Sequence, residues 1–312
     1  MKPIKIKTLL SALVLLALLA LATNYLINNI HEFKQLSLTN IYLILPITII
    51  FLINYFLIGL ITMLLLKSLK LKLSLKESFA LSIITGFYNL ITPFRGGMAA
   101  RAVYLKKRYD FAYVNFLATL SAVYVLVFLI ASFLGIISTI IIYFQTGIFS
   151  WVLFLIFDAV FLLMLSISVA SPKLKEREGK WINRFIKVIN GWHLIKENKK
   201  IITITALITL IQIILSTIML YLQFAVFGIE ISFASALFLS SIGNLSIVIA
   251  VTPGNLGISE AITVFSALTI GITATESLSA TLLGRAVSLV VLFILGPIFS
   301  YILLRKKSVD KA

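Results

Sequence analysis

Two short stretches contain the residues of this sequence that could act on a ligand. "TPFRGGMAAR" begins at Thr92 and "TPGNLGISEA" begins at Thr252, so one Thr-Pro design recurs about 160 residues later. A threonine followed by proline is typical of a helix start. The free N–H groups at such a start attract an anion, and the guanidinium of Arg95 adds a planar donor suited to phosphate. The pattern predicts anion binding and indicates no catalytic residue.

Charged residues inside apolar segments are the second chemical feature. Arg95, Asp158, Glu260 and Arg285 all interrupt apolar runs. An ionisable side chain in a membrane segment is costly, which makes each a functional candidate by default. We expect Glu260 to pair with Arg285, and Asp158 to neutralise Arg95 or Arg285. A purely structural ion-pair role for the four is the alternative.

Together these features predict one head-group site built from both stretches. Glycines there would let a head group or another backbone come close. The alternative is that Arg95 extends to the cytoplasmic surface and the glycines only allow tight packing. The predicted head-group residues are Thr92, Pro93, Arg95, Gly96, Gly97, Arg101, Pro253, Gly254, Asn255, Gly257, Glu260 and Arg285, with Asp158 for charge balance. Other polar residues that could line a cavity or bond between helices are Tyr88, Asn89, Asn115, Gln212, Gln223 and Asn244.

The composition is that of an integral membrane protein. Of 312 residues, 61% are hydrophobic and 12% are charged. Since the apolar runs do not alternate with polar residues, they predict a helical bundle rather than a barrel. We expect an all-α polytopic fold in one membrane domain, residues 1–312, with a multi-pass location in the cytoplasmic membrane. Six full spans are predicted, at 8–27, 41–66, 113–143, 151–170, 201–226 and 278–304.

Two segments, 78–100 and 233–272, resist assignment as single spans because each is interrupted at its Thr-Pro pair. We predict two re-entrant hairpins. That topology leaves 24 of the 27 Lys and Arg residues on the cytoplasmic side, all but Lys34, Arg95 and Arg285. Because basic residues accumulate on that side, the count supports the hairpins and places both termini in the cytoplasm.

The predicted elements divide into two halves of opposite orientation. Residues 1–143 and residues 151–304 each read span, span, hairpin, span, an inverted repeat. Interrupted segments at matching positions of such halves point to the binding site of a transporter. Coincidence of two Thr-Pro pairs in a helical bundle is the alternative.

The remaining polar features indicate no cofactor. Zero cysteines and two separated histidines, His31 and His193, predict no metal site. The net charge of +16 follows from the positive-inside pattern and would attract anionic lipid, so no nucleic acid partner is expected. The basic loop 171–200 carries apolar residues at helical spacing over 180–196, which predicts an interfacial amphipathic helix.

The two stretches resemble the transmembrane region of lysylphosphatidylglycerol synthases of the multiple-peptide-resistance factor type and related flippase-like proteins. Met98 replaces a glutamate usual in that family, and Asn255 replaces a glycine. The resemblance implies the translocating region without the soluble aminoacyl-transferring domain. The residues that match are Pro93, Arg95, Gly97, Arg101, Pro253, Gly254, Gly257 and Glu260, together with Gly284 and Arg285 in the last span.

The sequence thus favours a lipid transporter, not an enzyme. We expect it to move a phospholipid, or another lipid with a phosphate-bearing head group, between leaflets, with Glu260 or Asp158 as candidates for proton coupling. The alternative is a membrane-embedded transferase or an accessory of a separate lipid-modifying synthase. Oligomerisation with further copies stays open.

Overall fold

The chain is all-helical wherever the structure describes it. The computed structural model describes residues 37–170, 195–249 and 251–309 and the single residues 175, 186 and 193, with the side chains of 248 and 304–309 left aside. This part contains helices and no strand. The predicted span 8–27 and most of the predicted amphipathic helix over 180–196 lie outside it.

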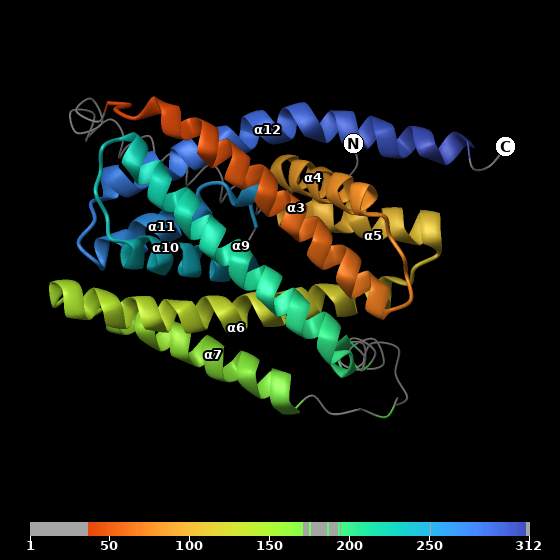
Figure 1. The fold of residues 1–312 in the computed structure, drawn as a ribbon, viewed down its shortest axis with the longest axis horizontal. Coiled ribbons are helices and arrows are strands. Elements are labelled where there is room, and N and C mark those ends of the chain that lie inside the picture. The colour runs from red at the N-terminus through yellow and green to blue at the C-terminus, as the bar shows by residue number, and fades with distance from the viewer. Residues whose placement is uncertain are drawn as a thin grey trace, which may run out of the picture.

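Five of the described helices are long and apolar enough to cross a membrane. They confirm the other five predicted spans, which makes this a multi-pass membrane protein. They are α3 (Ile44–Ser68, preceded by η1, Ile41–Leu43), α6 (Tyr113–Thr146), α7 (Trp151–Ala170), α9 (Lys199–Val226) and α12 (Ala274–Val309). Figure 1 shows α6 and α12 running close to the long axis of the molecule, with α3 and α9 crossing it obliquely.

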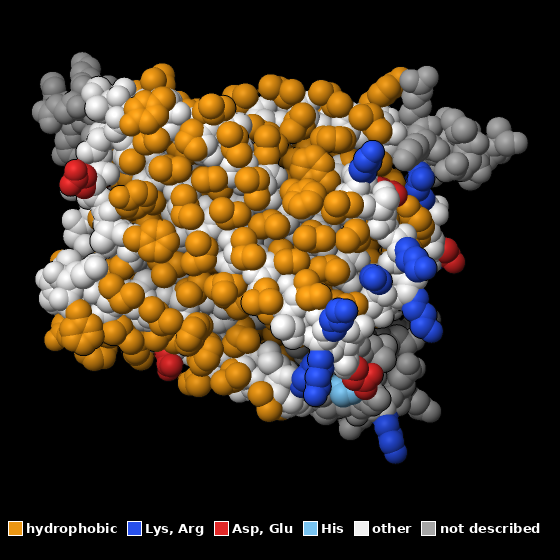
Figure 2. Space-filling model, viewed as in Figure 1, with side chains coloured by type: hydrophobic (Ala, Val, Ile, Leu, Met, Phe, Trp, Pro, Cys, Tyr) orange, Lys and Arg blue, Asp and Glu red, His pale blue; other side chains and the backbone are white. Residues whose placement is uncertain are grey.

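The surface has an apolar region and a basic region, which follow each other along the long axis of the molecule. Figure 2 shows a broad hydrophobic band, with the Lys and Arg side chains gathered at one end, which we call the basic end. The described ends of α3, α5 and α9 bring lysines there, among them Lys67, Lys107 and Lys199. Apolar surface with charge confined to its edge is the pattern that a bilayer imposes.

The first interrupted segment forms two helices joined by a break. α4 (Leu75–Ile91) begins at the basic end, where the Ser74 hydroxyl accepts from Glu77 N at 3.3 Å, and α5 (Gly96–Tyr109) returns to that end (Figure 1). The break between them is η2 (Pro93–Arg95). We call α4 and α5 the first helix pair.

The returning helix is longer than predicted, and this corrects the position of Arg101. The predicted hairpin segment ends at residue 100, yet α5 continues to Tyr109. Ala102 and Leu105 pack into the apolar core while the basic run beginning at Lys106 takes the outer face.

The second interrupted segment also forms two helices, and their outer ends lie at the end of the molecule opposite to the basic end. α10 (Phe233–Leu245) and α11 (Ile258–Leu268) have their outer ends at the end of the molecule away from the lysines (Figure 1). Between them lie η3 (Ser246–Ile249) and η4 (Pro253–Asn255). This second helix pair packs through α10 against α6, around Phe157, Phe224 and Phe238. The division into repeats 1–143 and 151–304 stays a prediction.

Candidate functional site

The two Thr-Pro breaks meet in the interior. The N–H of Phe94 donates to the carbonyl of Val251 at 3.3 Å, so residues far apart in sequence become neighbours. Their backbones also match, because Thr92 and Thr252 are both extended and each proline opens a short 3-10 turn. The next two residues are left-handed in both breaks. Their φ values are 52° for Phe94, 55° for Arg95, 59° for Gly254 and 57° for Asn255.

The left-handed turn corrects the predicted helix start at Thr92. The Thr92 hydroxyl makes no capping hydrogen bond to η2. It donates instead to the carbonyl of Tyr88, at the end of α4. Since two left-handed residues cannot continue a right-handed helix, α5 begins only at Gly96. Pro93 therefore opens a turn rather than a half-helix.

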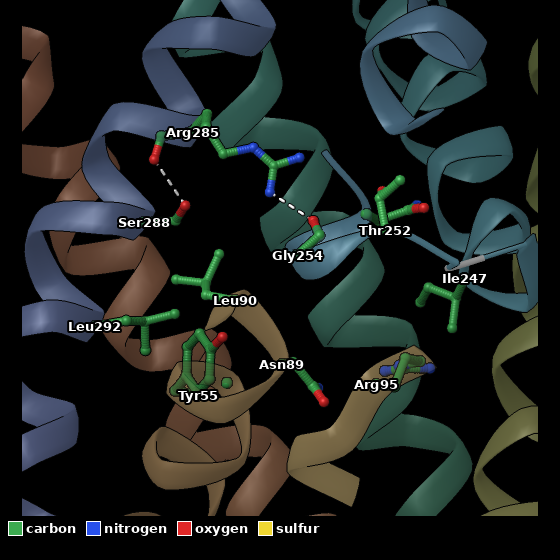
Figure 3. A pocket seen from close by; sticks show the side chains of 12 residues that line it. Tyr55, Asn89, Leu90, Arg95, Ile247, Thr252, Gly254, Arg285, Ser288 and Leu292 are labelled. Atoms are coloured by element: carbon green, nitrogen blue, oxygen red, sulfur yellow. Dashed lines mark hydrogen bonds between the residues drawn. The ribbon is translucent and has the colours of Figure 1, made fainter. Parts of the chain in front are cut away.

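A pocket of about 260 Å³ lies where the breaks meet. Figure 3 shows Arg285 from α12 and Arg95 from η2 on different sides of it, with Asn89 between them in this view. The side-chain oxygens of Asn89 and Asn255 are buried and have no hydrogen-bond partner in the described part of the chain. A polar pocket with unpartnered groups is suited to a polar ligand. Its lining is Tyr55, Gly86, Asn89, Leu90, Arg95, Ile247, Thr252, Gly254, Asn255, Arg285, Ser288 and Leu292.

Arg285 is held by a complete set of acceptors. Its Nε and Nη2 donate to Oε1 of Glu260 at 2.9 and 2.6 Å, and Nη1 donates to the Gly254 carbonyl at 2.6 Å. Oε2 of Glu260 accepts from Gly257 N at 2.7 Å, which caps α11. The predicted ion pair of Glu260 and Arg285 is therefore present, and it joins α12 to the second break. Glu260 itself is buried behind the pocket.

Arg95 is held differently. Its Nη1 donates to the Tyr124 hydroxyl on α6 at 2.6 Å, and its guanidinium carbon lies 5.7 Å from the centre of that ring. In the described part of the chain it has no carboxylate partner. The pocket therefore has one guanidinium whose charge is balanced and one whose charge is not.

The other predicted charges lie elsewhere. Arg101 is buried and donates to the hydroxyls of Thr85 at 2.9 Å and Thr62 at 3.1 Å, away from the pocket. Asp158 lies on α7, which packs against α6, and makes no ion pair with Arg95 or Arg285 in the described structure. The predicted neutralisation by Asp158 is wrong because α7 lies at the periphery of the bundle (Figure 1).

The predicted glycines separate into lining and packing positions. Gly254 lines the pocket. Gly97 does not, and a Cβ there would lie 2.0 Å from the Thr85 carbonyl, so it serves close contact of α5 with α4. Gly96 packs on Thr92 in the same way. The packing alternative thus applies to both. Gly257, Pro93 and Pro253 shape the breaks and do not line the pocket.

Sequence reasoning missed two tyrosines of this site. Tyr55 and Tyr124 lie within long apolar spans, where an aromatic residue usually belongs to the core. Asn89 was recognised as a polar residue on a membrane segment. No periodic or motif signal marks Tyr124, whose role follows only from the position of Arg95.

Comparison with protein families decides the relationship of the chain. The family model described as "Lysylphosphatidylglycerol synthase TM region" matches residues 6–296. The chain belongs to this family. In this member of the lysylphosphatidylglycerol synthase TM region family, the match spans both helix breaks and the pocket between them. No curated protein and no solved structure matches the chain.

Proposed function

We propose that this protein moves a phospholipid, or another lipid with a phosphate-bearing head group, between the leaflets of the membrane. The proposal rests on one observation: Arg95 lines the central pocket, and none of the described residues pairs a carboxylate with it. A phosphate would supply the missing counter-charge, and a guanidinium presents paired donors to it. Membership of the family supports a lipid as the carrier of that phosphate.

The path follows from the two helix pairs. We propose that they are re-entrant hairpins, so that the breaks lie near the middle of the bilayer. Their outer ends lie at opposite ends of the molecule, and the pocket lies between their tips (Figure 1). A head group entering from either leaflet would reach the same pocket, while the acyl chains stay in lipid.

The two arginines have separate roles in this proposal. Arg285 and Glu260 form a neutral pair that holds the second break in place, because Arg285 also binds the Gly254 carbonyl. Arg95 binds the head group. Since Tyr124 holds it with a hydroxyl and a ring face, the positive charge remains available to the ligand.

The test is translocation of head-group-labelled lipids in proteoliposomes, read with a membrane-impermeant reducing agent outside. The wild type should move lipid faster than empty vesicles. Arg95→Ala should abolish the increase in translocation rate. Arg95→Lys should retain part of it, because lysine keeps the positive charge but lacks the paired donors of the guanidinium. Lys72→Ala, which removes an exposed cation at the basic end, is the matched control and should resemble the wild type.

Three outcomes would contradict the proposal. Equal rates for the wild type and Arg95→Ala would remove the pocket from the path. Inert wild-type protein across anionic, zwitterionic and aminoacylated lipids, with and without a proton gradient, would favour an accessory of a lipid-modifying enzyme. Chemical change of the lipid with an added donor would favour a transferase.

A further inference from the structure

A second pocket of about 270 Å³ lies at the basic end, apart from the breaks. α4 packs on both α5 and α12, so it forms the floor between those two helices. We call this pocket the α5–α12 groove. Its wall is apolar in the interior and basic at the rim. The lining residues are Leu81, Ile84, Tyr88, Ala100, Val103, Tyr104, Lys107, Arg108, Ser300 and Leu303.

In the described part of the chain, the basic residues at the rim differ in how their charges are paired. Lys106 pairs with Asp110 at 2.6 Å, and Arg108 lies 3.4 Å from Oε1 of Glu77. Lys107 is exposed at the groove and has no ion-pair partner in the described structure. Among the described side chains of the lining, Lys107 is thus the cation available to the negatively charged phosphodiester of a lipid.

A buried carboxylate holds the rim in position. Glu77 on α4 accepts from the hydroxyl of Tyr104 at 2.5 Å and from that of Tyr109 at 2.7 and 2.8 Å, and it is 8% exposed. Burial, and then the hydrogen bonds to Glu77, raise the pKa of both phenols, so they stay protonated donors at neutral pH. These bonds fix α5 against α4, and the position of Lys107 follows.

The interior of the groove has an unused polar atom. The Ser300 hydroxyl on α12 is buried and has no hydrogen-bond partner in the described residues. It lies among Leu303, Ile84 and other apolar side chains of the lining. A buried hydroxyl in an apolar groove would bind an oxygen of the occupant, which indicates a ligand with both hydrocarbon and polar groups.

We propose that the α5–α12 groove binds one anionic phospholipid from the membrane leaflet at the basic end. The phosphate lies at Lys107, an acyl chain follows Ile84 and Val103, and Ser300 donates to an ester oxygen. The groove binds this lipid whether or not the central pocket transports. It is a site of its own, because the two linings share no residue.

The test counts lipid retained by purified protein. The full chain in mixed micelles is equilibrated with phosphatidylglycerol or phosphatidylcholine, separated from free lipid, and examined by native mass spectrometry. Wild type should retain one more phosphatidylglycerol than Ala100→Trp, in which the indole fills the groove. Ala99→Trp is the matched control, since Ala99 is exposed and does not line the groove. Its lipid count should equal that of the wild type.

Charge is tested by a second variant. Lys107→Gln should lower retention of phosphatidylglycerol about fivefold, the effect of one cation at an anionic lipid surface, and leave phosphatidylcholine unchanged. Elution volume and melting temperature of each variant show that it is folded. Equal retention of phosphatidylglycerol by wild type and Ala100→Trp would overturn the proposal. So would equal retention of the two lipids by wild type with no effect of Lys107→Gln.

Discussion

The breaks after Thr92 and Thr252 share a backbone and differ in their charges. Each places two left-handed residues directly after a proline. In the second break these are Gly254 and Asn255, residue types that adopt this conformation readily, and the nearby Arg285 is neutralised by Glu260. In the first break they are Phe94 and Arg95, and no carboxylate pairs with Arg95 in the described structure.

This difference is the basis for proposing a stabilising role for the second break and a binding role for the first. A left-handed residue other than glycine or asparagine costs about 1–2 kcal/mol, and Phe94 and Arg95 both incur that cost. Strained residues with an unbalanced charge are typical of functional positions. The second break is held by the ion pair of Glu260 and Arg285, and the first break contacts it through the hydrogen bond from Phe94 to Val251.

The largest expected effect is loss of the carboxylate in the second break. Glu260→Ala removes the counter-ion of Arg285, whose side chain is 16% exposed, and should lower the free energy of unfolding by about 3–5 kcal/mol. Arg95→Ala, at the unpaired arginine, should lower it by less than half as much. Denaturant unfolding in micelles measures both. The double variant Glu260→Ala/Arg285→Ala should recover part of the lost stability. If it recovers none, the stabilising role proposed for this ion pair is contradicted.

A smaller effect is expected from a methyl group in the first helix pair. Gly97→Ala places Cβ 2.0 Å from the Thr85 carbonyl, so α5 must move from α4 at a cost of about 1–3 kcal/mol. Gly243→Ala, on α10 of the second pair, has nothing within 4 Å of its Cβ and should be neutral or stabilising. The melting temperatures of the two variants give the comparison. A similar shift in both would mean that α4 and α5 pack less closely than described.

The left-handed positions give the third prediction. Gly254→Ala should cost about 1–2 kcal/mol, since φ is 59° and its Cβ would lie 2.8 Å from a methyl group of Leu90. Asn255→Gly should change stability by less than about 1 kcal/mol, because the glycine adopts the same φ without strain. Unfolding midpoints decide between them, and a larger loss in Asn255→Gly would show that the asparagine side chain matters more than the backbone.

The smallest effect on stability belongs to Tyr124. Tyr124→Phe removes the hydroxyl that accepts from Arg95 but keeps the ring beneath the guanidinium and its stacking on Phe128. We expect a loss of about 1 kcal/mol or less in unfolding free energy. Lipid translocation should change more than stability does, because Arg95 is then less firmly placed. An unchanged translocation rate would indicate that the ring alone positions it.

Local sequence patterns predicted most of the helices. The wrong predictions concern features that no local pattern marks. Long apolar runs identified five described spans, and Thr-Pro identified both breaks, because these signals lie within one segment. The start of α5 was predicted too early, and its end too early as well. Pro93 alone does not reveal that Phe94 and Arg95 turn left-handed, and a basic face hides a helix that packs through Ala102 and Leu105.

Charge pairing was likewise predicted only in part from the sequence. Glu260 and Arg285 were predicted as partners because both interrupt apolar segments, and they are. Asp158 also interrupts an apolar segment, but the sequence does not show which helices lie beside that segment. The tyrosine that holds Arg95 and the carboxylate that holds Tyr104 and Tyr109 carry no sequence signal, because each becomes a partner only through contact between helices.

By itself the sequence determined that this chain is a helical membrane protein with two interrupted segments and a few charges in apolar surroundings. Hydrophobic length and proline act locally, so they can be read along the chain. The tertiary structure decided that the two breaks touch, that Glu260 neutralises Arg285, and that no carboxylate of the described residues pairs with Arg95. Those facts depend on which helices become neighbours, and helix packing brings together residues that the chain separates by more than a hundred positions.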